Sequence, residues 1–252
     1  MHEEYIRLHP SADTAVLFIH GICGTPDHFR RLIGLEKLVP EHWSVYNLLL
    51  DGHGGSPRDF AATSREKWEN QVQQAYTILT ENHQHILIVG HSMGTLFALQ
   101  LAVAHPDIVK KLFLLAVPMR PRLKLSLVAD LLLMVLGKLE DAPEHRIALV
   151  RAAGIRTTWK LWEYIPWMPR FLDLFRIIGQ TEKVIPCVSA DCRCYQSQKD
   201  ELVWPGSEKV LKRNEKFRII RLEDSSHFYY APADRVRLTE DFQKWIKNPT
   251  AE

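Results

Sequence analysis

A serine lies at the centre of the pentapeptide GHSMG, residues 90–94, between two segments of different character. The residues before it, 86–89, are apolar and mostly β-branched, which is typical of a buried strand. The residues after it, 96–103, place apolar side chains at helical spacing. The chain must therefore turn sharply at Ser92, and the flanking glycines allow close packing there. Such a strand–turn–helix exposes the serine hydroxyl as a nucleophile; the alternative is a glycine-rich turn with an incidental serine.

A serine hydroxyl is a poor nucleophile at neutral pH and needs a base and a carboxylate that orients the base. Where the nucleophile sits on such a turn, the partners follow along the chain in the order acid, then histidine. Asp200 follows an extended stretch, 193–196, and His227 follows an expected strand that ends at residue 222. Both positions lie beyond the carboxyl ends of strands, where open α/β sheets place their chemistry. The sequence therefore predicts a catalytic triad of Ser92, Asp200 and His227.

Other acids and histidines fit these roles less well. Asp191 precedes the expected strand, and Asp224 is too near the predicted base in the same loop. His91 lies inside the turn, His53 lies in a glycine-rich loop, and His105 lies at the end of a helix. For the two predicted partners themselves, the alternatives are a turn carboxylate and a surface loop histidine.

Acyl transfer also needs N–H donors for the oxyanion that develops on the substrate. One donor is expected from Met93, the residue after the nucleophile, and the other from the loop HGICGTPDHF after an early strand. The glycines of this loop let its backbone approach a substrate. The sequence favours the N–H of Ile22, with Cys23 as the alternative, and gives His20 a structural hydrogen bond.

A second loop, DGHGGSPRDF, follows the next strand at the same edge of the expected sheet. In it, Asp51 and His53 would brace the mouth of the site or the oxyanion loop, or have a purely structural role. The side chains that we predict to contact the substrate are Cys23, His53, Leu132, Trp159 and Trp162.

Strands and helices alternate along most of the chain, which predicts a mostly parallel sheet with helices on both faces. We expect strands at 15–19, 43–50, 86–89, 111–116 and 217–222, and helices at 64–82 and 233–247.

The middle of the chain breaks this alternation. Residues 119–185 show helical patterns, several prolines and many aromatic residues, but no clear strand. We predict that this segment is a helical cap inserted into a core made of residues 1–118 and 186–252. The apolar run LKLSLVADLLLMVLGKL is shorter than a membrane span and contains Asp130, which favours a lid helix over a membrane helix. Transient contact of the cap with lipid stays open.

The composition is that of an ordinary globular domain. The chain has 252 residues, a formal net charge of +2, 46% apolar residues and 25% charged residues. This balance gives no reason to expect a nucleic-acid partner. Cys187, Cys192 and Cys194 lie close together without a second ligand cluster, so free thiols are expected in place of zinc or disulfides. The N-terminal residues MHEEYIRLHP lack a signal core, which predicts a cytoplasmic protein. We further expect a monomer or homodimer and, because the triad chemistry requires none, no cofactor.

Several stretches together resemble the α/β-hydrolase superfamily: FIHGICGTPDHF, LLLDGHGGSPRDF, IVGHSMG, SQKDELVWP and EDSSHF. The GHSMG turn and the DGHGGS loop are similar to those of small bacterial carboxylesterases and monoacylglycerol lipases. The resemblance implies an eight-stranded, mostly parallel sheet with a helical cap, and it places the triad on Ser92, Asp200 and His227.

The function expected from these residues is hydrolysis of small to medium acyl or aromatic carboxylic esters through an acyl-enzyme. The same triad could cleave amides, thioesters or carbon–carbon bonds, because specificity depends on the cap and pocket. A ligand sensor without turnover is the alternative from another class. Halide displacement is disfavoured, since it uses a carboxylate nucleophile and this turn carries Ser92.

Overall fold

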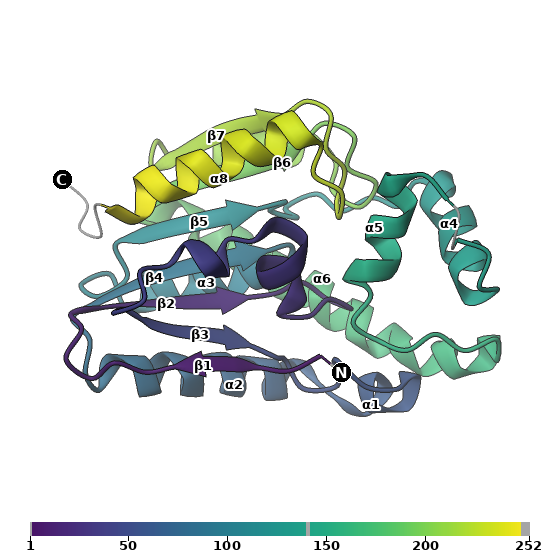
Figure 1. The fold of residues 1–252 in the computed structure, drawn as a ribbon, viewed down its shortest axis with the longest axis horizontal. Helices are drawn as coiled ribbons and strands as arrows, with labels where there is room; N and C mark the ends of the chain where they lie inside the picture. Colours follow the sequence, from purple (N-terminus) through teal and green to yellow (C-terminus); the bar gives the residue numbers. More distant parts are fainter. Residues whose placement is uncertain (1, 140–141, 248–252) are drawn as a thin grey trace.

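The computed structural model describes residues 2–139 and 142–247, which fold around one twisted sheet (Figure 1). In this part of the chain the sheet has seven strands in the order β1-β3-β2-β4-β5-β6-β7, and β1 alone runs antiparallel to its neighbour. The strands are β1 (Tyr5–Arg7), β2 (Thr14–Ile19), β3 (Ser44–Leu48), β4 (His85–His91), β5 (Lys111–Leu115), β6 (Asp191–Ser197) and β7 (Phe217–Leu222).

The prediction of eight strands is wrong by one. The residues before β2 hold only the short edge strand β1 and a turn in which the N–H of Ala12 donates to the carbonyl of His9. This stretch is too short for a second edge strand. The predicted strands at 15–19, 86–89, 111–116 and 217–222 are confirmed within one or two residues, and that at 43–50 is shorter at both ends. The extended stretch before Asp200 is longer than expected and begins at Asp191 itself.

Helices cover both faces of the sheet, which explains why its central strands are apolar on both sides (Figure 1). One face packs against α2 (Arg65–Thr80), α3 (Met93–Ala104) and α6 (Met168–Val184), with Trp68 in its core. The other face packs against η1 (His28–Ile33) and α8 (Pro232–Lys247), with Trp245 in its core. The remaining short helices are η2 (Glu36–Leu38), α1 (Pro57–Ala62), η4 (Ile185–Cys187) and α7 (Ser207–Leu211).

The segment predicted to be a cap is helical; part of it lies at one end of the sheet, and its last long helix, α6, packs on one face. It contains α4 (Leu125–Val135), α5 (Glu144–Ala152), η3 (Leu161–Trp167) and all of α6. The arrowheads of β2, β3 and β5 point toward the end of the molecule where α4 and α5 lie (Figure 1). The carboxyl ends of the strands, where the predicted site residues occur, therefore face this helical segment. None of the helices in the described ranges combines the length and apolar character needed to cross a bilayer.

Candidate active site

Ser92 occupies the tight turn between β4 and α3 with a strained backbone. Its φ of 51° and ψ of −120° lie in a region that residues with a Cβ rarely adopt. A Cβ at Gly94 would collide with the carbonyl oxygen of Ile19, and one at Gly90 would lie 2.8 Å from the backbone of Thr95. The two glycines therefore let α3 start directly against β2, and the serine side chain is held at the apex of the turn.

Asp200 and His227 form a buried, hydrogen-bonded pair. The carboxylate is 1% exposed and the imidazole 2% exposed, and His227 Nδ1 donates to Asp200 Oδ2 at 2.9 Å. The second oxygen, Asp200 Oδ1, accepts the N–H groups of Leu202 and Val203, each at 2.7 Å. All of this fixes the orientation of the carboxylate, and it leaves Nε2 of the imidazole as the proton acceptor.

The loop that carries His227 lies against the serine turn. His91, the residue before Ser92, donates from Nε2 to the carbonyl of His227 at 3.2 Å, and the two rings are 4.9 Å apart. The N–H of His227 also donates to the carboxylate of Glu201 at 3.1 Å. Within the described part of the chain, Ser92 Oγ has no hydrogen bond to the imidazole; such contacts often tighten only when a substrate binds.

The loop after β2 supplies backbone N–H groups beside the serine. Gly21 packs so closely that a Cβ there would lie 2.8 Å from that of Ser92. The N–H groups of Ile22 and Met93 have no hydrogen-bond partner among the described residues. The N–H of Cys23, the alternative donor, instead donates to His53 Nε2 at 3.1 Å. The free donors are therefore Ile22 and Met93, the pair that the sequence favours.

His53 is hydrogen-bonded to the loop after β2, and both of its ring nitrogens have partners in the protein. Its Nδ1 lies 3.2 Å and 3.1 Å from the carbonyls of Leu50 and Asp51, so it carries the proton, and Nε2 is left to accept from Cys23. Burial lowers the pKa of His53 to about 4, which keeps the ring neutral. His20 is held in the same way: Nδ1 donates to the carbonyl of Gly21, and Nε2 accepts from the Leu50 N–H.

Sequence reasoning missed the number of neutral histidines that surround the serine turn. His28 stacks on His91 with ring centroids 3.7 Å apart, and its Nε2 is 3.2 Å from the Tyr230 hydroxyl. Burial, assisted by the neighbouring His227, lowers the pKa of His28 to about 3. Burial also lowers the pKa values of His20 and His91, with further contributions from nearby histidines. The sequence did contain a signal for two of these histidines, because a histidine stands next to a turn glycine in both HGICG and GHSMG.

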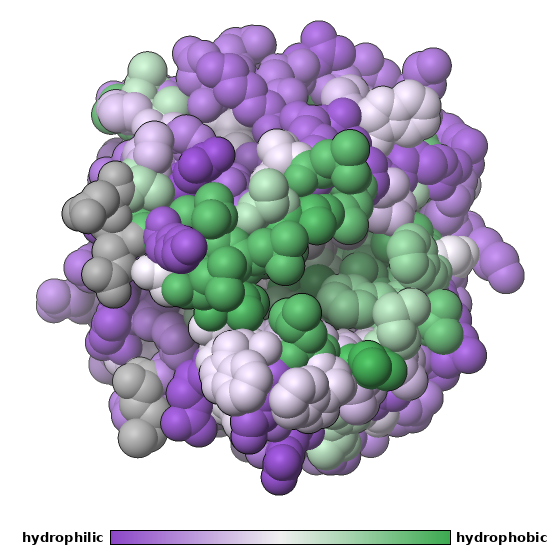
Figure 2. Space-filling model, turned by 90° about the vertical axis from the view of Figure 1, so that its right-hand side faces the viewer, coloured by the Kyte–Doolittle hydropathy of each residue, from purple (hydrophilic) through white to green (hydrophobic). Residues whose placement is uncertain are grey.

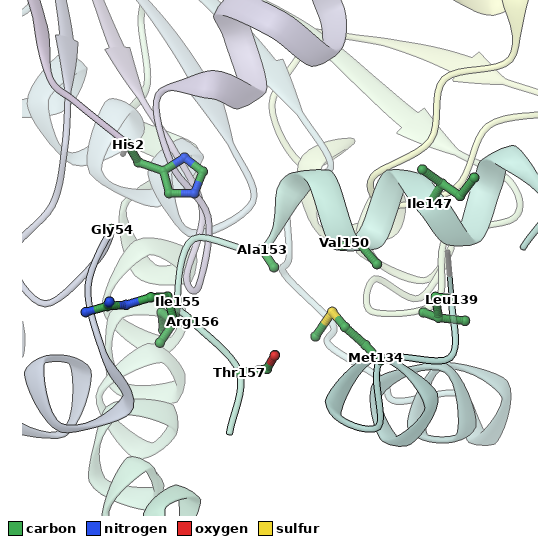
Figure 3. A pocket seen from close by; sticks show the side chains of 11 residues that line it. His2, Gly54, Met134, Leu139, Ile147, Val150, Ala153, Ile155, Arg156 and Thr157 are labelled. Atoms are coloured by element: carbon green, nitrogen blue, oxygen red, sulfur yellow. The ribbon is translucent and has the colours of Figure 1, made fainter. Parts of the chain in front are cut away.

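Three of the side chains predicted to contact the substrate come from the segment predicted to be a cap. Leu132, Trp159 and Trp162 are exposed, and the two indole rings pack edge to face at 5.9 Å from each other. A cavity of about 550 Å³ lies between α4, α5 and residues 153–157, and His2 and Gly54 also line it. Met134 and Val150 face each other across this cavity (Figure 3). No triad residue lines the cavity, but Gly154 in its wall segment donates its N–H to the Cys23 carbonyl.

Titratable groups that could hold a metal are not clustered. Over residues 2–139 and 142–247, no group of three or more His, Cys, Asp or Glu side chains is arranged around a common centre. The cysteines are free thiols, and burial raises the pKa of Cys23 to about 12. Burial also raises the pKa of Cys192 and Cys194, so these thiols stay protonated at neutral pH.

Comparisons with known proteins identify a family model and several relatives that match this chain. The model of the alpha/beta hydrolase family matches residues 16–237. A thermostable monoacylglycerol lipase from Bacillus sp. strain H-257 is 26% identical over 229 residues, which are 89% of this chain and 87% of that protein. A carboxylesterase from Bacillus subtilis strain 168 is 30% identical over 95 residues, 37% of this chain and 38% of the relative. A solved structure from work on LipS and LipT, two metagenome-derived lipolytic enzymes, has a TM-score of 0.72 at 20% identity and covers 98% of this chain and 97% of that chain. This last likeness shows the fold alone.

Proposed function

The chain belongs to the alpha/beta hydrolase family, and on this premise we propose that it is a serine hydrolase that cleaves carboxylic esters through an acyl-enzyme. The observation that carries the proposal is the buried hydrogen bond of 2.9 Å between Asp200 and His227, beside a strained turn that presents Ser92. The similarity to a monoacylglycerol lipase and to a carboxylesterase supports an ester as the substrate.

In the first half of the proposed reaction, Ser92 Oγ attacks the carbonyl carbon of the ester. His227 Nε2 takes the hydroxyl proton, and the resulting imidazolium is stabilised by Asp200 through Nδ1. The negative charge that develops on the carbonyl oxygen is stabilised by the N–H groups of Ile22 and Met93. When the tetrahedral intermediate collapses, the carbon–oxygen bond to the alcohol breaks, and His227 returns its proton to the leaving alcohol.

In the second half, water hydrolyses the acyl-enzyme by the same steps. His227 takes a proton from water as the water oxygen attacks the acyl carbon, and the bond to Ser92 Oγ then breaks. The serine recovers its proton from the imidazolium, and the carboxylic acid leaves. The neutral histidines around the turn suit this cycle, because they add no charge that competes with the imidazolium.

We assign residues 119–185 to a cap and residues 1–118 and 186–252 to the catalytic core. The cavity of about 550 Å³ in the cap is lined mainly by aliphatic side chains, which suits an ester with a small to medium acyl group or an aromatic group. Leu132, Trp159 and Trp162, being exposed, would contact only the outer part of such a substrate.

The experiment that tests the proposal measures turnover of an activated short-chain ester by the protein and by Ser92→Ala. Turnover and labelling by a fluorophosphonate probe are expected to disappear in the variant, with the probe attached to the peptide that contains Ser92. Ser226→Ala is the matched control, because this buried serine lies next to His227 and its Oγ accepts the Tyr229 N–H. Equal turnover by the protein and Ser92→Ala would refute the assignment.

The same assay separates the alternatives that use this triad. An ester, a thioester and an anilide with one common acyl group are compared by kcat/KM; ester cleavage is expected to lead. Faster cleavage of the thioester or the anilide would assign the protein to thioester or amide hydrolysis in place of ester hydrolysis. Labelling of Ser92 without turnover of any acyl donor, or no labelling at all, would favour a ligand sensor.

A further inference from the structure

The outer surface of the cap is unusually apolar. Among the described residues, thirteen of the eighteen exposed large apolar side chains lie between residues 119 and 185. Leu125 is 86% exposed, Ile165 69% and Trp159 68%. Figure 2, a view onto the end of the molecule that carries α4 and α5, shows apolar side chains gathered around a hollow. We call the exposed apolar side chains of residues 119–185 the cap face. A monomeric protein rarely exposes such a continuous apolar surface without a partner.

The cap also carries the positive charge of the molecule. Residues 119–185 contain eleven Lys and Arg residues against seven Asp and Glu, whereas the whole chain contains 32 against 30. Acids of the cap pair with arginines, as in Asp130 with Arg146 at 3.0 Å and Glu163 with Arg58 at 3.7 Å.

Lys138 and Lys160 are two of the cap lysines that lie close to exposed apolar residues in the sequence. Lys138 follows Leu136 by two positions, and Lys160 stands between Trp159 and Leu161. Neither lysine forms an ion pair with an acid in the ranges that the structure describes. Over the described residues, the cap face is therefore an apolar surface accompanied by lysines that form no ion pair there.

We propose that the cap face docks on an anionic lipid surface, which would bring the hollow of the cap against the lipid that contains the ester substrate. The proposal deepens the proposed function and rests on it for the substrate. Indole rings beside lysines are suited to the boundary between headgroups and acyl chains, where the ring stays partly buried and the ammonium reaches phosphate. Lysine near an anionic bilayer adds a favourable electrostatic contribution that salt screens.

A second copy of the chain fits this surface less well. In a two-fold symmetric dimer each cap face would meet its own copy, so the excess of positive charge would repel itself. An anionic surface has the complementary charge. A lipid surface also accepts apolar side chains that come from a helix, a loop and a 3₁₀ segment without demanding one matching shape.

The proposal is tested by sedimentation of the protein with phosphatidylcholine vesicles that contain either no phosphatidylglycerol or about 30 mol% of it. The anionic lipid gives the vesicles a clear negative surface potential. We expect the protein to bind the anionic vesicles at least about tenfold more strongly than the neutral ones. Salt at about 0.5 M should weaken this binding, because the screening length is then only a few ångströms. The double variant Leu125→Asn/Ile165→Asn is expected to lose most of the binding. The double variant Lys138→Gln/Lys160→Gln is expected to lose the preference for anionic vesicles.

Two controls keep the result interpretable. Val236→Asn changes an exposed apolar residue of α8, outside the cap, and is expected to bind vesicles like the unmodified protein. Unfolding midpoints and the turnover of a water-soluble short-chain ester are expected to stay unchanged in all three variants, because their positions are on the surface. Loss of ester turnover in the unmodified protein would defeat the proposed function and leave the docking result standing.

Three outcomes would overturn the docking proposal. One is equal binding to neutral and anionic vesicles, or no binding to either. Another is binding that survives Leu125→Asn/Ile165→Asn while Val236→Asn removes it. The third is a dimer in solution, detected by light scattering, that the cap-face substitutions dissociate, since the surface would then be covered by a second copy of the chain.

Discussion

Mild acid should destabilise this protein because of the buried histidines around the serine turn. His20, His28, His53 and His91 are all buried. Burial is the main cause that lowers each pKa, to about 3 for His28 and to about 4 for His53. In the unfolded chain the same rings would titrate near their ordinary pKa of about 6.5.

The sign and size of the effect follow from proton binding. Below about pH 6.5 the unfolded chain binds protons that the folded protein does not, so the free energy of unfolding falls as pH falls, until the folded-state pKa is reached. The loss approaches about 1.4 kcal/mol per pH unit for each such histidine. Between about pH 7.5 and pH 5.0, His28 and His53 each remove about 2 kcal/mol, and together about 4 kcal/mol. His20 and His91 act in the same direction, whereas Glu36, whose pKa burial raises, acts in the opposite one.

A loss of this size is measurable, because domains are typically stable by only about 5–15 kcal/mol. The assay is urea unfolding followed by far-UV circular dichroism at several values between about pH 5 and pH 7.5, the window set by the unfolded pKa and the lowered folded pKa values. His28→Gln is expected to reduce the slope of unfolding free energy against pH by up to about one proton, since one buried ring is removed. His42→Gln, in an exposed position, is the matched control and should leave the slope unchanged.

The reasoning would be refuted if the free energy of unfolding stayed level or rose as the pH is lowered from about 7.5 to about 5.0. A slope that His28→Gln and His42→Gln change equally would also refute it. Either result would mean that the rings around the serine turn take up protons as readily in the folded protein as in the unfolded chain.

Four further substitutions, one of them a control in α6, test the site and its supports. Asp200→Asn should lower kcat by about 10³–10⁴-fold with little change in circular dichroism, because the amide oxygen can still accept both backbone N–H groups while His227 loses its orienting acceptor; a loss below tenfold would contradict the triad. His53→Phe should lower kcat by about 10–100-fold and change KM less, because the oxyanion loop loses an acceptor for one of its N–H groups; a change in KM alone would contradict that role. Gly94→Ala should lower the thermal unfolding midpoint by the equivalent of about 3 kcal/mol or abolish folding, because its Cβ meets a carbonyl of β2. Gly179→Ala in α6 should raise the midpoint by the equivalent of about 0.5–1 kcal/mol, because nothing lies within 4 Å of the new methyl; equal shifts in both variants would contradict the packing argument.

The parts of the fold that were predictable from sequence are those in which local pattern and burial agree. Residues 86–89 are apolar because β4 is covered on both faces, and the turn after it needs glycine on both sides of Ser92. β7 was predicted with its observed bounds. Its sequence, FRIIRL, mixes apolar residues with arginines, and the strand has buried positions separated by exposed ones. By contrast, β1 was missed, because it is a three-residue edge strand with partly exposed side chains and no periodicity to detect.

The parts that were not predictable depend on contacts between distant segments. Nothing in the residues around Cys23 indicates that its N–H is bound by His53, thirty positions later, and this contact decides which N–H remains for an oxyanion. The exposure of Trp159 and Trp162 could not be predicted from the sequence either. Aromatic residues in a helical insertion suggest a buried lining, but their burial depends on how the insertion packs on the core.

Hydrogen bonds between the predicted cap and the rest of the protein limit how the cap can move. Near its start, Pro121 pairs with Val203 in an isolated bridge, and Arg122 donates to the carbonyl of Asp200 in the acid loop. At its middle, Gly154 donates to Cys23 at 2.7 Å and accepts from the Gly54 N–H at 2.5 Å.

A rigid swing of the whole cap would therefore break backbone hydrogen bonds to both the acid loop and the oxyanion loop, and would disturb the geometry that the proposed reaction needs. A Cβ at Gly154 would also collide with the carbonyl of Gly24, so the two segments cannot be separated or crowded without cost. A substrate is accordingly expected to reach Ser92 with the base of the predicted cap held in place. On this reasoning, hydrogen bonds from Arg122 and Gly154 tie the predicted cap to the loops that carry Asp200 and Cys23, and the cap sequence by itself does not reveal these contacts.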